Sequence, residues 1–559
     1  MFKPVIPAGG IRLVATIALL SLGVVGTTWA ASPPQTLGDL VRAGKRESVL
    51  AAITSPDVDV NEKAPDGSTA LMWAVFNVDR ELTRALLKAG AKANVTNRYG
   101  ASALAEAVKL EDVELVRLLL DAGADVDSQN LDRQTALMLA ISTGSLPITK
   151  LLIERGADVN VLETFRNQNA LMWAAGGNLP EIVDLLLAHG AKNVDLRAKH
   201  DDWSRQQTSE PRAQYQSRQT GGLTALLYAT RSGCYRCAVA LVKAGADVNK
   251  PNPDGVTPLI NALDNKRFDI ALFLLDQGAN PHVWDMSGRT PLYVAVDMNS
   301  FTAGGGFGGG AGARTGARAG FPEGFGANDA AGGPAPPPAI KAMDVVNRLL
   351  AMGVDANHQL TRKRPYGASR GRFADYDLRG GVGPLFVAAM SHDHEAVKAL
   401  LAHGAEVDLN NVLQMTPLMV AAGMRGTGGG GGAAAGAQGG GDVQARAITT
   451  IDLLLDAGAN INARVTDSHT HTAKIMAYVQ GRDQEGRTAL FAAAEGGRDR
   501  MVKHLIERGA DIAIRDAAGK TALDVARGPA PTGPGTAGAT AAAGRTAAIA
   551  VLEAAARSK

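Results

Sequence analysis

The sequence has few aromatic residues and very few cysteines. Phenylalanine, tryptophan and tyrosine make up 4% of its 559 residues, and the two cysteines are Cys234 and Cys237. This count excludes a cystine-rich secreted domain, because such domains need several bridges to compensate for a small core. The low aromatic content and the 65 glycines argue against a single globular enzyme domain and favour a modular chain.

An excess of charge of one sign is also missing. The chain has 57 basic and 55 acidic residues, which gives a formal net charge of +2. A protein that binds nucleic acid along its whole length should be plainly basic. The composition therefore argues against nucleic acid as the partner.

Long hydrophobic runs are absent from the sequence, except near its start. Lys3 and Arg12 precede an uncharged stretch at 13–29, which ends in small residues before Ala30. This pattern is typical of a signal peptide at 1–30, and it predicts export to the periplasm or the extracellular medium, with no membrane span after cleavage. The alternative is a retained anchor, because the stretch lies at the lower length limit for crossing a bilayer.

The most prominent feature that the sequence does contain is an internal repeat. A Thr/Ser-Ala/Pro-Leu tripeptide or a near variant begins at positions 69, 102, 135, 169, 224, 257, 290, 383, 416, 488 and 521, and six of the intervals are 33 residues. In eight of the ten complete units a glycine follows 21 residues after this Thr-type position. A period in the low thirties indicates a stack of supersecondary units.

The two landmarks predict where helices begin and end. Thr257 precedes Pro258, so a hydroxyl can cap a first helix that starts on a residue of fixed φ. The later glycine supplies the left-handed conformation that ends a second helix. Apolar residues between the landmarks follow helical spacing, and Asp, Asn and Gly gather beyond the glycine. Each unit is therefore predicted to contain two short helices and a hairpin turn.

These units resemble ankyrin repeats, as the segments GSTALMWAV at 67–75 and AGADVN at 244–249 illustrate. The match spans nearly all of residues 36–527. The resemblance implies an all-α ankyrin-repeat α-solenoid of about twelve units, with paired short antiparallel helices and β-hairpin-like loops. The family usually places a histidine after Thr-Pro-Leu, whereas this chain has mainly apolar residues there. Apolar packing is expected to replace the hydrogen bonds of that histidine.

The predicted organisation follows from the spacing. It comprises a signal peptide at 1–30, an N-terminal capping unit at 31–64, ankyrin repeats at 65–298, 341–424 and 442–527, and a C-terminal capping helix at 545–559. Gly/Ala-rich insertions between the two helices of a unit are predicted to be disordered, and they lie at 299–340, 425–441 and 528–544. Three further insertions lengthen hairpins, at 197–219, 361–381 and 465–484.

A helix pair of this size cannot bury its apolar face alone, so the units stack and leave a long surface exposed. The resemblance implies a non-catalytic scaffold that binds another protein through its concave face and hairpin tips, without a cofactor. Exposed aromatic and arginine residues are the strongest candidates for contacts. The candidates transferred by repeat position are Phe76, Asn77, Arg98, Tyr99, Lys109, Met286 and Arg289.

Two of the lengthened hairpins add aromatic and basic candidates. These are Trp203 and Tyr215 in the first, and Arg362, Lys363, Arg364, Tyr366, Arg372, Phe373 and Tyr376 in the second. Such loops fit an acidic protein surface. The alternative is an envelope-associated structural protein whose basic hairpins bind an anionic polymer, and the simplest interpretation is that charge keeps long loops soluble.

Motifs that could support chemistry are incomplete. Gly519 and Lys520 suggest a phosphate-binding loop, but Ile514 occupies the position of its first glycine. Cys234 and Cys237 have redox spacing, yet no histidine follows for haem and no second thiol pair exists for zinc. Two inert thiols or a local disulfide are therefore expected.

Two histidine pairs could contribute metal ligands. They are His392 with His394 and His469 with His471, and no third ligand can be identified from their spacing. The sequence therefore predicts neither a metal site nor a catalytic site.

Overall fold

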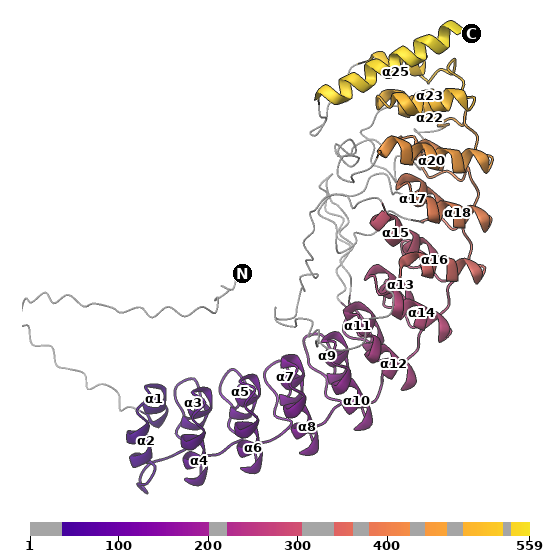
Figure 1. Ribbon diagram of the computed structural model, residues 1–559. Helices are drawn as coiled ribbons and strands as arrows, with labels where there is room; N and C mark the ends of the chain where they lie inside the picture. Colours follow the sequence, from indigo (N-terminus) through magenta and orange to yellow (C-terminus); the bar gives the residue numbers. More distant parts are fainter. Residues whose placement is uncertain are drawn as a thin grey trace, which may run out of the picture. The chain divides into compact units, whose positions relative to one another are not determined.

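The computed structural model describes residues 36–200, 221–303, 340–361, 380–424, 442–466, 484–528 and 538–558. The chain divides into two compact units, Met1–Lys92 and Ala93–Lys559. In the described ranges the regular elements are α-helices, arranged as two consecutive pairs in the first unit and ten in the second (Figure 1). The predicted all-α repeat architecture with about twelve units is confirmed.

Each pair has a first helix, which follows the Thr-type position in the complete units, and a second helix. The first helices are α1 (Leu37–Arg42), α3 (Ala70–Phe76), α5 (Ala103–Lys109), α7 (Ala136–Thr143), α9 (Ala170–Gly176), α11 (Ala225–Ser232), α13 (Pro258–Asp264), α15 (Pro291–Ala303), α17 (Pro384–Met390), α19 (Pro417–Ala421), α22 (Ala489–Glu495) and α24 (Ala522–Arg527). The second helices are α2 (Arg46–Ala52), α4 (Arg80–Lys88), α6 (Val113–Asp121), α8 (Leu146–Glu154), α10 (Pro180–Ala188), α12 (Tyr235–Lys243), α14 (Phe268–Asp276), α16 (Ala342–Ala351), α18 (His394–Ala402), α20 (Val443–Asp456), α23 (Asp499–Glu507) and α25 (Gly538–Ser558).

The helix boundaries confirm the roles of both landmarks. Ser102 Oγ accepts the N–H of Ala105 at 3.1 Å at the start of α5, and Thr257 Oγ1 accepts that of Ile260 at 3.3 Å at the start of α13. The ten landmark glycines all have positive φ, between 74° and 100°. A Cβ at these glycines would meet open space, so the backbone conformation alone requires glycine.

The core lies between two layers of helices. In the compact unit formed by residues 93–559, the first helix of each repeat contacts the first helix of the next repeat. The second helices contact one another in the same order (Figure 1). The leucine four residues before each landmark glycine is 0% exposed in all ten complete units. Burial of one such side chain contributes about 1.5–3 kcal/mol, so the repeated leucines account for much of the cohesion of the stack.

Apolar residues occupy the position where the family usually has histidine. Leu227, Ile260, Tyr293 and Phe386 are at most 1% exposed there. Only the last unit differs, because Asp524 is exposed and its carboxylate caps α24 through Thr521. The predicted replacement of hydrogen bonding by apolar packing is confirmed for the other units.

Two predicted insertion boundaries were wrong. Residues 299–303 belong to α15, where Asn299 and Ser300 donate hydrogen bonds to the Asp393 carboxylate at 2.7 and 3.1 Å. α25 begins at Gly538 because alanine, the best helix former, dominates 538–548. Insertion residues 304–339, 425–441 and 529–537 and the predicted signal peptide at 1–30 lie outside the described residues.

None of the helices in the described ranges combines the length and the apolar character needed to cross a bilayer.

A ladder of Asp and Asn side chains ties the segments after most of the second helices to their neighbours. Asn160 is a typical member, because its Oδ1 accepts the N–H of Lys192 at 2.8 Å and its Nδ2 donates to the Gly190 carbonyl at 3.2 Å. Asp127 accepts the equivalent N–H of Asp158 at 2.9 Å. An ionised aspartate has no donor for the carbonyl of the next landmark glycine. Asp127 therefore makes one of the two hydrogen bonds that an asparagine makes at this position.

We expect Asp127→Asn to raise the free energy of unfolding by about 1 kcal/mol at neutral pH, because asparagine keeps the acceptor and adds a donor. Burial, reinforced by the charges of Asp158 and Asp125, raises the pKa of Asp127 above its ordinary value despite the Asp158 N–H. The folded state therefore binds this proton more tightly than the unfolded state, and the ionised carboxylate costs stability as the pH rises through the folded-state pKa.

Urea unfolding at several pH values checks this expectation. The advantage of Asp127→Asn should be present at pH 7 and shrink below about pH 4, where aspartate is protonated in both states. Asn160→Asp is the reverse control and should destabilise at pH 7. Equal stability of wild type and Asp127→Asn at pH 7 would contradict the role given to the missing donor.

Candidate protein-binding surface

In the compact unit at 93–559, a single Asn or Asp side chain shapes each hairpin of regular length between repeats. Asn97 Oδ1 accepts the N–H groups of Tyr99 at 3.0 Å and Ala101 at 2.9 Å, while its own N–H donates to the Ala101 carbonyl at 3.0 Å. The same bonds recur around the turn residues Asn130, Asn252, Asp285, Asn411 and Asp516. Sequence reasoning missed this role, although the signal is present as an Asn or Asp five residues before the Thr-type position.

Glu163 is the turn residue of a hairpin that is one residue longer. Its carboxylate accepts the N–H groups of Phe165 at 2.6 Å, Arg166 at 2.9 Å and Gln168 at 3.0 Å. Glu163 itself is 2% exposed. The longer side chain therefore spans the wider turn and holds Phe165 at its tip.

The three lengthened hairpins have an apolar residue at the turn position. Ala198, Leu360 and Val465 occupy it, and each is buried. Their N–H groups donate to the carbonyls of residues 223, 382 and 487, at 3.0 Å in each case. A backbone pair thus closes the neck of each lengthened hairpin where a side chain shapes the others.

Backbone hydrogen bonds also connect neighbouring hairpins of the second unit edge to edge. Thr164 N donates to Asp132 O at 2.8 Å, and Lys199 N donates to Arg166 O at 2.5 Å. A Cβ on Gly100, whose φ is +70°, would lie 2.8 Å from the backbone nitrogen of Leu131, so glycine permits that close approach. The tips that carry Tyr99, Leu131 and Phe165 therefore form a contiguous surface, because each one rests against the next.

The structure exposes several of the candidate contact residues. Tyr99 is 70% exposed at its tip, next to the exposed Arg98, and Met286 is 38% exposed on a later hairpin. Lys109 is exposed at the end of α5, where Nζ lies 3.6 Å from the Glu106 carboxylate. These side chains are placed where a partner can reach them.

In the first unit, Phe76 and Asn77 end α3 and have different surroundings. Phe76 is 53% exposed and its ring packs edge-on against Trp73, with centroids 5.7 Å apart. Asn77 Nδ2 donates to the Val41 carbonyl at 3.1 Å, so its amide already joins two repeats. Phe76 is therefore the stronger contact candidate of the two.

Arg289 was wrongly placed on the exposed surface by sequence reasoning. It is 8% exposed and bridges two carboxylates, with Nε 2.7 Å from Asp285 and Nη1 2.8 Å from Asp264. Burial opposes its charge, but these two carboxylates outweigh burial and raise the pKa of the guanidinium. The side chain packs inward because both acids lie beneath the hairpin.

The aromatic and basic candidates of the lengthened hairpins lie outside the described residues. They are Trp203, Tyr215, Arg362, Lys363, Arg364, Tyr366, Arg372, Phe373 and Tyr376.

Two exposed apolar tip residues escaped the sequence analysis. Leu131 is 73% exposed and Phe165 is 68% exposed, on the two hairpins that follow Tyr99. The guanidinium of Arg166 lies over the Phe165 ring, 5.5 Å from its centroid. Both residues lie four residues before a Thr-type position, as Arg98 and Met286 do, so the repeat register carried a signal for them that the sequence analysis did not use.

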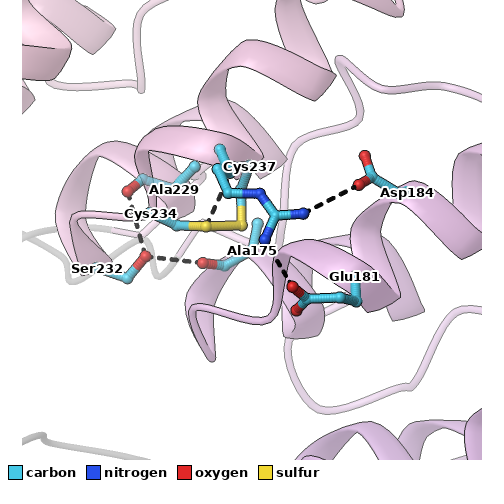
Figure 2. The surroundings of a disulfide bond; sticks show 8 residues. Ala175, Glu181, Asp184, Ala229, Ser232, Cys234 and Cys237 are labelled. Atoms are coloured by element: carbon cyan, nitrogen blue, oxygen red, sulfur yellow. Dashed lines mark hydrogen bonds and ion pairs between the residues drawn. A yellow bond between two sulfur atoms is a disulfide. The ribbon is translucent and has the colours of Figure 1, made fainter. Parts of the chain in front are cut away.

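The two cysteines form a disulfide at the start of α12 (Figure 2). Cys234 is the N-cap residue, and both cysteines are at most 2% exposed. Beside them Ser232 Oγ donates to the Ala175 carbonyl at 2.8 Å, and Arg236 contacts Glu181 at 2.6 Å (Figure 2). The bridge lies in the interior between repeats and offers no sulfur atom to a substrate.

The described histidine pair is spread over a turn and a helix start. His392 has a φ of +53° in the turn before α18, and His394 Nε2 lies 2.9 Å from the Arg446 carbonyl oxygen. His469 and His471 lie outside the described residues. Within the described ranges, no group of three His, Cys, Asp or Glu side chains is placed to hold a metal ion.

Stacked helix pairs with edge-linked hairpins define a repeat solenoid, and comparison with known families identifies its class. A model described as "Ankyrin repeats (3 copies)" matches residues 37–130, 112–198 and 207–285, and models described as "Ankyrin repeats (many copies)" match 385–427 and 478–526. The chain belongs to the ankyrin-repeat family, whose repeats generally mediate binding to other proteins.

Among solved structures, the crystal structure of the ankyrin repeat domain of Bcl-3, titled a unique member of the IkappaB protein family, is similar to part of the chain. The sequences are 28% identical, the match covers 43% of this chain and 98% of that domain, and the TM-score is 0.34. No curated protein matches the sequence.

Proposed function

We propose that the chain is a non-catalytic scaffold that binds another protein through its hairpin tips and the exposed ends of its first helices. The contiguous, edge-linked tips that expose Tyr99, Leu131 and Phe165 carry this proposal. Exposed large apolar side chains on a rigid support favour binding, because little conformational freedom is lost when a partner docks.

We further propose that the protein works outside the cytoplasm. The N-terminal sequence of a signal peptide and the Cys234–Cys237 disulfide both support an oxidising compartment.

Affinity capture tests the scaffold. The full chain is immobilised and exposed to soluble and envelope fractions of its native source, in low salt and in about 0.5 M salt, where charge attraction is screened within a few ångströms. Retention of a protein at high salt is expected. Protease treatment of the fraction should abolish this retention.

Retention of protease-resistant material at low salt alone would instead establish the alternative, an envelope-associated structural protein that binds an anionic polymer. Retention of no protein would refute the scaffold.

A further inference from the structure

Three successive hairpin tips each combine one cation with one large exposed apolar side chain. We call this set the tip row, and it consists of Arg98, Tyr99, Leu131, Arg133, Phe165 and Arg166. All six residues are exposed. The next hairpin continues the series with the exposed Lys199, whereas the hairpin around Asn252 carries Pro253 and Asp254 instead. Among the hairpin residues that the structure describes, this pairing of charge and apolar surface is found on these three successive tips.

The spacing of the tips limits what can bind along the row. Stacked helices lie roughly 8–10 Å apart, and the bond from Thr164 N to Asp132 O keeps the tips in step with the helices below. A polyproline II segment rises about 3.1 Å per residue with three residues per turn, so every third side chain returns to one face after about 9.3 Å. Seven residues of an α-helix advance about 10.5 Å, which lies beyond that range.

We infer that the tip row binds an extended, polyproline II-like segment of a partner protein in which a carboxylate and an apolar side chain recur every three residues. The inference rests on the proposed scaffold function and specifies the chemistry of its partner. Each hairpin then offers its guanidinium to one carboxylate and its apolar side chain to one apolar residue. Three hairpins read three such triplets in succession.

The charges of the tips favour a peptide over a nucleic acid. Asp132 is an exposed carboxylate in the middle of the tip row. A nucleic acid has a phosphate on every nucleotide and would be repelled there. A peptide can place an uncharged residue opposite Asp132.

Fluorescence anisotropy with the full chain and labelled twelve-residue peptides tests the inference. The probe (Pro-Glu-Leu)4 is compared with (Pro-Lys-Leu)4, with (Pro-Glu-Leu-Ser)3, whose period is four, and with single-stranded oligothymidine. The first peptide is expected to bind at least about tenfold more tightly than each of the others. Equal or tighter binding of any comparison probe, or no binding of the first, overturns the inference.

Variants tie the binding to the tip row. Reversing Arg98, Arg133 and Arg166 to glutamate should weaken (Pro-Glu-Leu)4 by at least about thirtyfold and strengthen (Pro-Lys-Leu)4, a sign change that unfolding cannot produce. Asp132→Asn should tighten the acidic probe about twofold to fivefold. Tyr99→Ser should weaken it about tenfold.

Leu146→Ser, at the exposed start of α8 and outside the tip row, is the matched control and should stay within about twofold of wild type. An unchanged affinity after the triple reversal overturns the inference. The capture experiment separates the two proposals: a captured protein that the triple variant still retains refutes the tip row but not the scaffold, whereas the absence of any captured protein refutes the scaffold itself.

Discussion

Arg289→Met is expected to lower the free energy of unfolding by about 3–5 kcal/mol, because it leaves the carboxylates of Asp285 and Asp264 without their buried cation. Asp285 is 3% exposed and also accepts the N–H groups of Ser287 and Arg289, so it cannot turn to solvent without opening its hairpin. The midpoint of urea unfolding, followed by circular dichroism, measures the loss.

Arg236→Met is the matched control for this prediction. Arg236 contacts Glu181 at 2.6 Å, but its side chain is 62% exposed, so its loss should cost at most about 1 kcal/mol. Asp285→Asn in the Arg289→Met background should restore part of the stability, because asparagine shapes the equivalent turn at Asn252 and carries no charge. Similar losses from Arg289→Met and Arg236→Met would show that burial of the pair has no special weight.

Glu163→Ala should open the hairpin that carries Phe165. Its carboxylate accepts three backbone N–H groups, and hydrogen bonds to charged groups are each worth about 1.5–3 kcal/mol. A local destabilisation of about 3 kcal/mol is expected after some rehydration of the freed amides. Amide hydrogen exchange at Phe165, Arg166 and Gln168 should accelerate by at least about a hundredfold.

Glu163→Gln separates the carboxylate from the length of the side chain. Glutamine can keep one oxygen near Arg166 and Gln168 but points an N–H donor toward Phe165 N, so an intermediate acceleration is expected. Exchange at Tyr99, two hairpins away, serves as the internal reference and should stay unchanged. Equal protection of Phe165 in wild type and Glu163→Ala would mean that the neighbouring hairpins, and not Glu163, hold this tip.

Much of the fold could be predicted from the sequence because the repeat fixes backbone conformation locally. A hydroxyl three residues before a helical N–H and a glycine with positive φ are requirements of single turns. The glycine is confirmed in all ten complete units, and the hydroxyl cap in most units, whereas Gly383 has no side chain to cap α17. The start of α25 was predicted too late, because the glycines of 528–544 suggested a disordered insertion. The alanines that follow Gly538 instead favour a helix.

The surface was harder to predict because exposure depends on neighbours outside the repeat unit. Arg289 was assigned to the surface by its register, yet Asp264 of the preceding repeat draws it inward. A signal was available, since Leu223, Val382 and Met415 occupy the equivalent position and are buried. Phe165 lies four residues before the Thr-type position at 169, the offset that gives Met286 before Thr290, so its register was a signal for exposure that the sequence analysis did not use.

Because a backbone pair closes the neck of each lengthened hairpin, the length of the loop beyond the neck does not affect the geometry of the repeats. Next to the neck at Leu360 and Val382, Thr361 N bonds to Ser287 O of the preceding hairpin, and Val412 N of the following hairpin bonds to Gly380 O. The edge that joins successive repeats therefore passes this insertion without a break. Loops of different length and sequence can therefore be inserted at these necks, by evolution or by engineering, without a change in the register of the repeats that support them.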